Sequence, residues 1–152
     1  MLEIVLDNLS QIRKSWETCM AHDNTGIVRG VYEAFARGDI PAVLGALDAN
    51  VEWQEAEGFL YADQNPYMGP EAVLAGVFAR LGGEWENFQA RPDSFLDAGE
   101  AVIAQGHYSG VYKATGKRIQ AQFAHVWTLR GGKVLTFQQY TDTKQFSEAA
   151  RG

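Results

Sequence analysis

Cysteine and histidine are scarce in this sequence, and their scarcity excludes several kinds of site. Cys19 is the only cysteine, so an internal disulfide is impossible, which fits a reducing compartment and leads us to expect a cytoplasmic protein. The three histidines are dispersed and lack a metal-binding spacing such as H-x-x-x-H. A glycine-rich phosphate loop and a G-x-S-x-G nucleophile elbow are also missing. We therefore expect no metal site, and no nucleophilic role for Cys19.

Long apolar runs and clusters of basic residues are missing as well. The longest apolar runs are far shorter than the roughly 20 residues that span a bilayer, and Glu3 and Asp7 interrupt the N-terminal segment. We therefore expect neither a membrane partner nor a signal peptide. The formal net charge is −6 and the 13 Lys and Arg residues are scattered, whereas proteins that bind polyanions cluster such side chains. Nucleic acid is not expected as a partner.

What the sequence has is material for one hydrophobic core. Hydrophobic residues make up 46% and aromatic residues 12% of its 152 residues, which suits a single domain that buries about two-thirds of its unfolded surface. Apolar residues at three- and four-residue intervals predict helices over residues 2–20 and 25–37. Pro41 and Pro70, each in a first turn, indicate two more over 39–47 and 70–81. We divide the chain into an N-terminal helical arm (1–23), one α+β domain (24–147) and a C-terminal tail (148–152).

Local signals mark where two of these helices begin and end. Asn24 or Thr25 can cap the helix over 25–37, because their side-chain oxygens can accept a hydrogen bond from a free backbone N–H. Gly38 can end that helix, and Asp39 can cap the next one.

Alternation of apolar and polar residues predicts one early strand and four late ones. The strands are expected over residues 50–55, 88–95, 101–112, 119–129 and 134–141. Thr115-Gly116 and Gly131-Gly132 fit tight turns between antiparallel neighbours. Helices followed by a run of antiparallel strands predict the α+β class. The segment 56–69 has no clear period, so we expect a mobile loop that borders the site.

The last hairpin predicts one wall of a pocket. A two-residue turn would pair His125 with Gln138 and Phe123 with Tyr140. The same face also carries Trp127, Leu129, Val134, Thr136 and, at its end, Asp142. Aromatic side chains around a polar centre are typical of small-molecule pockets.

The opposite face of this hairpin is also partly apolar. It carries Ala124, Val126, Leu135 and Phe137 among glutamines and threonines. Because such a face is too apolar to be fully solvated, we expect it to form a subunit contact in a homodimer.

Glu55 shares one strand face with Val51 and Trp53. A carboxylate in such surroundings loses hydration, which raises its pKa and suits a general base near neutral pH. The alternative is that Glu55 lies at the strand end, where it meets water or caps the following loop.

His125 is the best-placed titratable side chain, because its neighbours in the pattern are apolar and its ordinary pKa suits proton transfer. The alternative is a core histidine whose hydrogen bonds are satisfied. His107 is expected to point away from Phe123 and is left out of the site, and His22 is expected in a linker.

Five segments follow, in order and spacing, the pattern of one known family. They are Val31–Ile40 (VYEAFARGDI), Val51–Glu55 (VEWQE), Tyr67–Val73 (YMGPEAV), Phe123–Trp127 (FAHVW) and Gly132–Asp142, which begins GKV and ends QYTD. Over residues 24–147 the chain resembles the SnoaL-like polyketide cyclase and ketosteroid isomerase-related branch of the nuclear transport factor 2-like superfamily. The resemblance implies a cystatin-like α+β barrel, in which a curved antiparallel sheet and N-terminal helices form a cone around an apolar pocket, usually in a homodimer.

The resemblance also bears on individual residues. Ketosteroid isomerases place a carboxylate base near the end of the first strand, which Glu55 matches, and they serve as a standard example of a base beside a neutral acid donor. Their oxyanion-hole tyrosine falls at Val31, with Tyr32 one place along, and their oxyanion-hole acid falls at His125. The Asp-Arg-Asp set of the related limonene epoxide hydrolases is not matched, because His125 and Phe123 replace an aspartate and the arginine.

Two hypotheses for the function remain open. The first is an acid–base enzyme that isomerises or cyclises a small hydrophobic carbonyl compound without a cofactor. In it Glu55 or Asp142 removes a proton, and His125 with Tyr140 or Tyr61 donates hydrogen bonds to the oxygen. The residues expected to hold the ligand are Trp53, Tyr61, Tyr67, Phe123, Trp127 and Gln138. The second hypothesis is a binding domain for a small hydrophobic ligand or a protein, without turnover.

Overall fold

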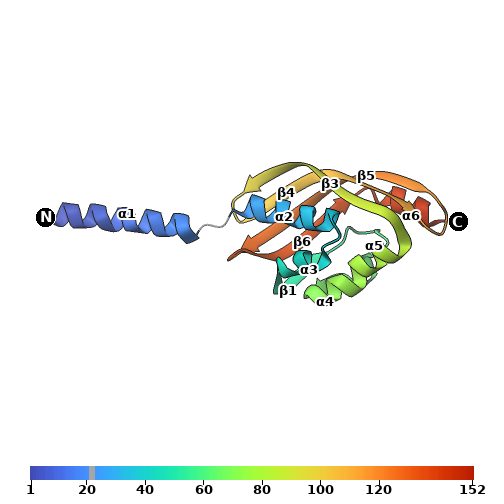
Figure 1. Ribbon diagram of the computed structural model, residues 1–152, viewed down its shortest axis with the longest axis horizontal. Coiled ribbons are helices and arrows are strands. Elements are labelled where there is room, and N and C mark those ends of the chain that lie inside the picture. Colours follow the sequence, from blue (N-terminus) through green and yellow to red (C-terminus); the bar gives the residue numbers. More distant parts are fainter. Residues whose placement is uncertain (21–22) are drawn as a thin grey trace.

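The computed structural model describes residues 1–20 and 23–152, and the side chains of residues 1–13 and 23–152. The predictions for the side chain of Cys19 and for His22 lie outside the described residues. The helix α1 (Leu2–Met20) lies apart from the rest of the chain (Figure 1), and its large apolar side chains as far as Ile12 are exposed. The remaining elements form a mixed α+β fold around one core.

Two short helices precede the first strand, and each begins at an aspartate. The carboxylate of Asp23 accepts a hydrogen bond from the backbone N–H of Gly26 at the start of α2 (Asn24–Ala36). Asp23 is therefore the cap, and the prediction of Asn24 or Thr25 was wrong by one or two residues. Asp39 caps α3 (Ile40–Gly45) through the N–H of Ala42, as predicted.

The helix predicted over 70–81 is a continuous run of three segments. They are α4 (Pro70–Val73), the wider turn η2 (Leu74–Phe78) and α5 (Ala79–Glu84). The loop before them contains the short helix η1 (Ala62–Gln64) and the short strand β2 (Tyr67–Met68). The helix α6 (Thr143–Ala150) was not predicted, and it crosses the boundary drawn at residue 147.

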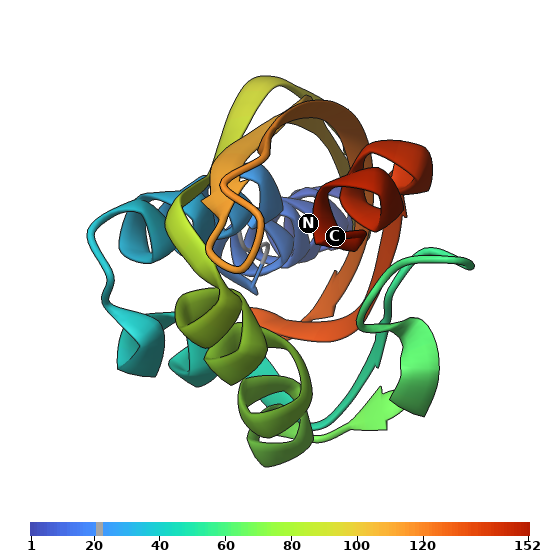
Figure 2. The same ribbon diagram turned by 90° about the vertical axis from the view of Figure 1, so that its right-hand side faces the viewer.

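One sheet contains all six strands. Besides β2 they are β1 (Leu47–Gln54), β3 (Trp85–Ala98), β4 (Ala101–Tyr112), β5 (Arg118–Arg130) and β6 (Lys133–Thr141). Their order is β2-β1-β6-β5-β4-β3, so the sheet is not closed. Neighbours are antiparallel except β1 and β6, which are parallel. The sheet curves strongly, with α2, α3 and the α4–α5 segment on one side of the molecule and α6 on the other (Figure 2).

The pairing of the last hairpin differs from the prediction by one residue. Arg130 pairs with Lys133 and Leu129 with Val134, but Thr128 pairs with Thr136, which leaves Leu135 as the extra residue of a bulge. A bulge shifts every later residue by one position, and a one-residue shift exchanges the two faces of a strand. The predicted pairs of His125 with Gln138 and of Phe123 with Tyr140 were therefore wrong.

Candidate functional site

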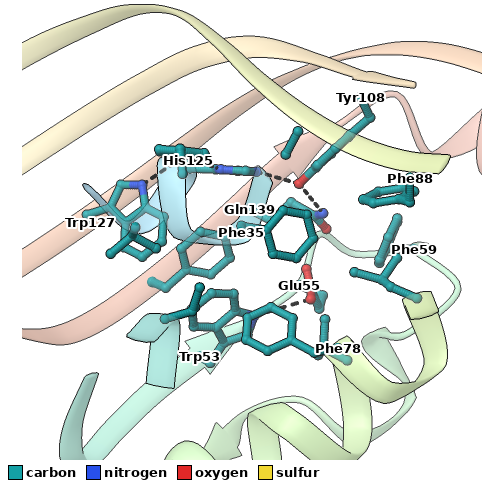
Figure 3. A pocket seen from close by; sticks show the side chains of 17 residues that line it. Phe35, Trp53, Glu55, Phe59, Phe78, Phe88, Tyr108, His125, Trp127 and Gln139 are labelled. Carbon is teal, nitrogen blue, oxygen red and sulfur yellow. Dashed lines mark hydrogen bonds between the residues drawn. The ribbon is translucent and has the colours of Figure 1, made fainter. Parts of the chain in front are cut away.

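The inner side of the curved sheet and the helices enclose one cavity (Figure 3). It is small, with about 60 Å³ open to the centre of a water molecule. Its walls are mostly aromatic and aliphatic, and the polar side chains among them come from α2, the end of β1, β4, β5 and β6. The lining residues are Val31, Tyr32, Phe35, Val43, Trp53, Glu55, Phe59, Val77, Phe78, Leu81, Phe88, Ala90, Tyr108, His125, Trp127, Phe137 and Gln139.

Glu55 is a buried carboxyl group in this cavity, with 3% of its surface exposed. Its backbone is fixed by Asn65, whose side-chain oxygen accepts from the Glu55 N–H (3.0 Å) and whose amide donates to the Glu55 carbonyl (2.8 Å). The Trp53 indole N–H donates to Oε1 at 3.2 Å, and Oε2 has no hydrogen-bond partner among the described residues. Burial raises the pKa of Glu55 to about 8, and the Trp53 hydrogen bond offsets part of that rise.

His125 lies between two tyrosine hydroxyls. Its Nδ1 is 2.5 Å from the Tyr32 Oη, and its Nε2 is hydrogen-bonded to the Tyr108 Oη. Each hydroxyl oxygen also accepts from a nitrogen donor, namely the Trp127 indole at 3.0 Å for Tyr32 and the Gln139 amide at 2.8 Å for Tyr108. Burial lowers the pKa of His125 to about 3, so the imidazole is neutral near pH 7.

The orientation of Gln139 follows from its second contact. Its side-chain oxygen accepts from the backbone N–H of Ala56 at 3.1 Å, which leaves the amide nitrogen to donate to Tyr108. Burial raises the pKa values of Tyr32 and Tyr108, so both are neutral phenols. The cavity thus offers one carboxyl group and a chain of neutral donors and acceptors, which suits a ligand with a polar oxygen on an apolar body.

Comparisons with known proteins assign the family. The model of the SnoaL-like domain matches residues 28–137. The chain belongs to the SnoaL-like family. This family lies within the nuclear transport factor 2-like superfamily and includes polyketide cyclases and isomerases. A comparison with functionally curated proteins found no match.

Solved structures share the fold of this SnoaL-like chain. An NTF2-like protein from Burkholderia thailandensis E264 is 37% identical, with a TM-score of 0.80 over 84% of this chain and 96% of that chain. An NTF2-like protein of unknown function from Burkholderia pseudomallei K96243 is 28% identical, with a TM-score of 0.78 over 86% and 99%. A protein from Jannaschia sp. CCS1, provisionally named a SnoaL-like polyketide cyclase, is 14% identical and shares the fold alone, with a TM-score of 0.73 over 86% and 92%.

Four of the predicted site residues line the cavity of this SnoaL-like domain: Trp53, Glu55, His125 and Trp127. Phe123 lies behind them, with its ring stacked on the His125 ring at 4.0 Å between centroids. The catalytic and binding roles assigned to these side chains stay predictions.

Three predicted site residues lie on the outside because of the bulge in β6 and the start of α6. Tyr140 is 57% exposed, and Gln138 is on the same outer side, where its amide donates to the backbone of Gln139. Asp142 accepts a hydrogen bond from Gln145 at 2.9 Å. The bulge brings Phe137 and Gln139 into the cavity in place of Gln138 and Tyr140.

Tyr61 and Tyr67 are buried beside the cavity and do not line it. The Tyr61 hydroxyl donates to Glu84 and accepts from the Trp85 indole at 3.0 Å. The Tyr67 hydroxyl donates to the backbone carbonyl of Tyr61 at 2.6 Å. Phe59 is the side chain of the 56–69 loop that reaches the cavity.

Sequence reasoning missed Tyr32, Tyr108 and Gln139. Tyr108 could have been found, because the predicted strand 101–112 alternates and His107 was already expected to face away from Phe123. His107 does lie outside, where its Nδ1 is 2.8 Å from Asp93. Among residues 1–13 and 23–152, whose side chains are described, no group of His, Cys, Asp and Glu could hold a metal ion. No helix within residues 1–20 and 23–152 has the length and apolar character of a membrane span.

Proposed function

We propose that this SnoaL-like chain is a cofactor-independent acid–base enzyme that isomerises or cyclises a small hydrophobic carbonyl compound. The observation that carries the proposal is the buried Glu55, whose unpaired Oε2 faces an aromatic cavity that also holds a chain of neutral hydroxyl and imidazole groups. The aromatic walls would hold the apolar body of the substrate, and the polar side chains would engage its oxygen.

Glu55 is suited to move a proton in both directions. With a pKa of about 8, about one-tenth of the molecules carry the carboxylate at pH 7, and this base is stronger than an exposed carboxylate. Its Oε2 would take a proton from the carbon next to the substrate carbonyl. The electron pair of that C–H bond would move onto the carbonyl oxygen, where hydrogen-bond donors stabilise the charge.

The fate of the resulting enolate distinguishes the two reactions. Return of the proton from Glu55 to a different carbon completes an isomerisation. Attack of the enolate carbon on a second carbonyl group forms a new C–C bond, and the proton from Glu55 then neutralises the new alkoxide. Both sequences return Glu55 to its starting state and need no metal ion or organic cofactor, because the substrate carbonyl itself accepts the electron pair.

Exchange of hydrogen for deuterium next to a carbonyl tests this proposal before the substrate is known. A panel of small aromatic and alicyclic ketones is incubated in D₂O with wild type or Glu55→Gln, and exchange is followed by NMR. We expect wild type to exchange at least one ketone about 10²-fold faster than the variant, the lower end of the range for general-base catalysis. Ketones that bind without any accelerated exchange would instead support the ligand-binding domain.

A further inference from the structure

The side chains around His125 form a symmetrical chain of hydrogen bonds. Trp127 donates to the Tyr32 oxygen, Gln139 donates to the Tyr108 oxygen, and His125 joins the two hydroxyl groups (Figure 3). Because both N–H donors are fixed, the only hydrogens that can be rearranged are the two hydroxyl hydrogens and the single imidazole N–H.

Counting these hydrogens leaves one of them unused. A neutral imidazole has one N–H and one acceptor nitrogen, so it can accept from only one tyrosine and must donate to the other. Its two hydrogen bonds use two of the three hydrogens. In either tautomer, one tyrosine therefore keeps an O–H that His125 does not accept.

The surroundings of Tyr32 and Tyr108 decide which of them keeps the hydroxyl hydrogen that His125 does not accept. Around Tyr32 lie the rings of Phe95, Phe123, His125 and Trp127. Its only described polar partners are the Trp127 N–H, which donates, and His125. A buried hydroxyl with no other acceptor is expected to donate to the one that is present, which here is Nδ1 of His125.

Tyr108 has a different neighbourhood. Its hydroxyl lies toward the same side of the cavity as Gln139 and Glu55 (Figure 3), and the charge of Glu55 contributes to the raised pKa of Tyr108. An O–H on this side can reach a bound ligand, and Oε2 of Glu55 lacks a partner there. The Nε2 of His125 then carries the hydrogen and donates to the Tyr108 oxygen.

We propose that Tyr108 is the residue that donates a hydrogen bond to the substrate oxygen, and that His125, as its Nε2–H tautomer, is a positioning residue that turns the Tyr108 hydroxyl hydrogen into the cavity. The ligand class that fits is a neutral carbonyl compound whose oxygen accepts from Tyr108 and whose adjacent C–H lies at Glu55. This inference rests on the proposed function for the reaction, but the hydrogen-bond arrangement can be tested without turnover.

Nitrogen NMR of the free protein tests the tautomer directly. In ¹⁵N-labelled protein near pH 7, we expect the His125 Nε2 to resonate as a protonated nitrogen and Nδ1 as an unprotonated acceptor. In Tyr32→Phe the Nδ1 resonance should move toward that of a nitrogen without a hydrogen bond. A proton on Nδ1, or on both nitrogens, would overturn the inference.

A matched pair of probes tests the donor. Acetophenone and α-methylstyrene have nearly the same shape, but only acetophenone has an acceptor oxygen. We expect Tyr108→Phe to weaken acetophenone binding about tenfold while α-methylstyrene binding is unchanged, which corresponds to one lost hydrogen bond. The carbonyl stretch of bound ¹³C-acetophenone should also move to higher frequency in the variant.

Tyr112→Phe is the control, because Tyr112 is on the same strand and packs against Trp85 without lining the cavity. It should leave both probes unaffected. Equal binding of the two probes to wild type, or an unchanged carbonyl stretch in Tyr108→Phe, would overturn the inference. If Tyr108 binds the probe oxygen but no ketone exchanges deuterium, the enzymatic proposal fails and this inference stands. If Tyr108→Phe exchanges deuterium into a ketone at the wild-type rate, the enzymatic proposal stands and this inference fails.

Discussion

At the scale of single residues, burial gives Glu55 and His125 opposite effects on stability. Folding raises the pKa of Glu55 from an ordinary 4.5 to about 8, so the folded state holds a proton that the unfolded state has released. It lowers the pKa of His125 from 6.5 to about 3, so the unfolded state holds the extra proton. The raised pKa of Glu55 therefore makes stability fall as pH rises, and the lowered pKa of His125 makes stability fall as pH decreases.

Between pH 6.5 and 8 the Glu55 effect outweighs the His125 effect, so the stability of the wild type should fall as pH rises. From the two pKa values we expect a loss of about 1.5 kcal/mol in the free energy of unfolding. Glu55→Gln has no ionisable group at this position and should lack that loss. Urea unfolding of both proteins at pH 6.5 and pH 8 measures it. Equal losses in the two proteins would show that Glu55 titrates at the same pH in the folded and unfolded states.

Replacing His125 should change stability on the acid side. Between pH 6.5 and 4.5, protonation of His125 in the unfolded state should lower the free energy of unfolding of the wild type by about 2 kcal/mol. His125→Phe should not show this loss. The variant lacks both hydrogen bonds to the tyrosines, so its stability at pH 6.5 is expected to be lower. The pH dependence is therefore the decisive measurement. Parallel unfolding free energies of the two proteins over this range would contradict a neutral, buried His125.

A site residue could be predicted from the sequence where its position follows from the alternation of its own strand, and not where it depends on pairing with another strand. Glu55 was found because strand alternation after Trp53 continues to the next odd position. His125 was found because its own strand is regular. Tyr32 was set aside because the resemblance aligned Val31 with the family's tyrosine, whereas both of these neighbours on α2 line the cavity. Gln139 depended on a pairing that the sequence does not specify.

At the scale of elements, the bulge at Leu135 is the feature that sequence reasoning could not supply. The Gly131-Gly132 turn was located correctly, and both strands were placed to within about one residue. The extra residue follows Val134, where β6 also pairs with Leu47 of the parallel strand β1. At Val134 the register of β6 is set by pairing with both β1 and β5. Because these strands are distant in sequence, the alternation within β6 alone does not reveal that register.

The side chain of Asn65 fixes the start of the loop over 56–69 through its two hydrogen bonds to the backbone of Glu55. Asn65→Ala removes both side-chain hydrogen bonds to the backbone of Glu55 and should lower the free energy of unfolding by about 1–2 kcal/mol. Hydrogen exchange of residues 55–66 should become faster, while exchange in β4 and β5 keeps its wild-type rates. The expectation that this loop is more mobile than the strands is tested in the same experiment on the wild type. Slow exchange there, equal to that of β5, would contradict it.

At the scale of the whole molecule, the sequence was sufficient for the class, the strand order along the chain and the single core. It did not reveal that the first and last strands are parallel neighbours, because a strand pattern carries no direction of pairing. It also missed α6, whose short apolar pattern of Phe146 and Ala149 directly follows a strand.

The expected homodimer stays a prediction, and the apolar side chains on the outer face of the sheet motivate it. Leu96, Ile103 and Val126 are paired across three strands on that face, with Tyr140 exposed nearby. Phe137, first expected there, is inside. We predict that wild type sediments as a dimer at micromolar concentration, and that Val126→Glu sediments as a monomer because an interface on this face would bury the new carboxylate away from water.

Removal of residues 1–20 is the matched control for that experiment. It deletes the exposed apolar side chains of α1 and leaves the sheet intact. The truncated chain should remain a dimer. A monomer after truncation, with Val126→Glu still dimeric, would assign association to α1 and refute the sheet interface.

The parallel pairing of β1 with β6 has a consequence for the order in which the molecule can be assembled. Trp53 lies opposite Phe137, so Glu55 is set in place only when two segments from opposite ends of the domain meet. Contacts between residues so distant in sequence form late and slow the folding of a domain. During synthesis β1 and β2 emerge long before β6, so the edge of β1 that pairs with β6 stays unpaired until β6 leaves the ribosome. The cavity is therefore completed only after β6 has been made, and a nascent chain that stops short of β6 does not yet hold Glu55 in position.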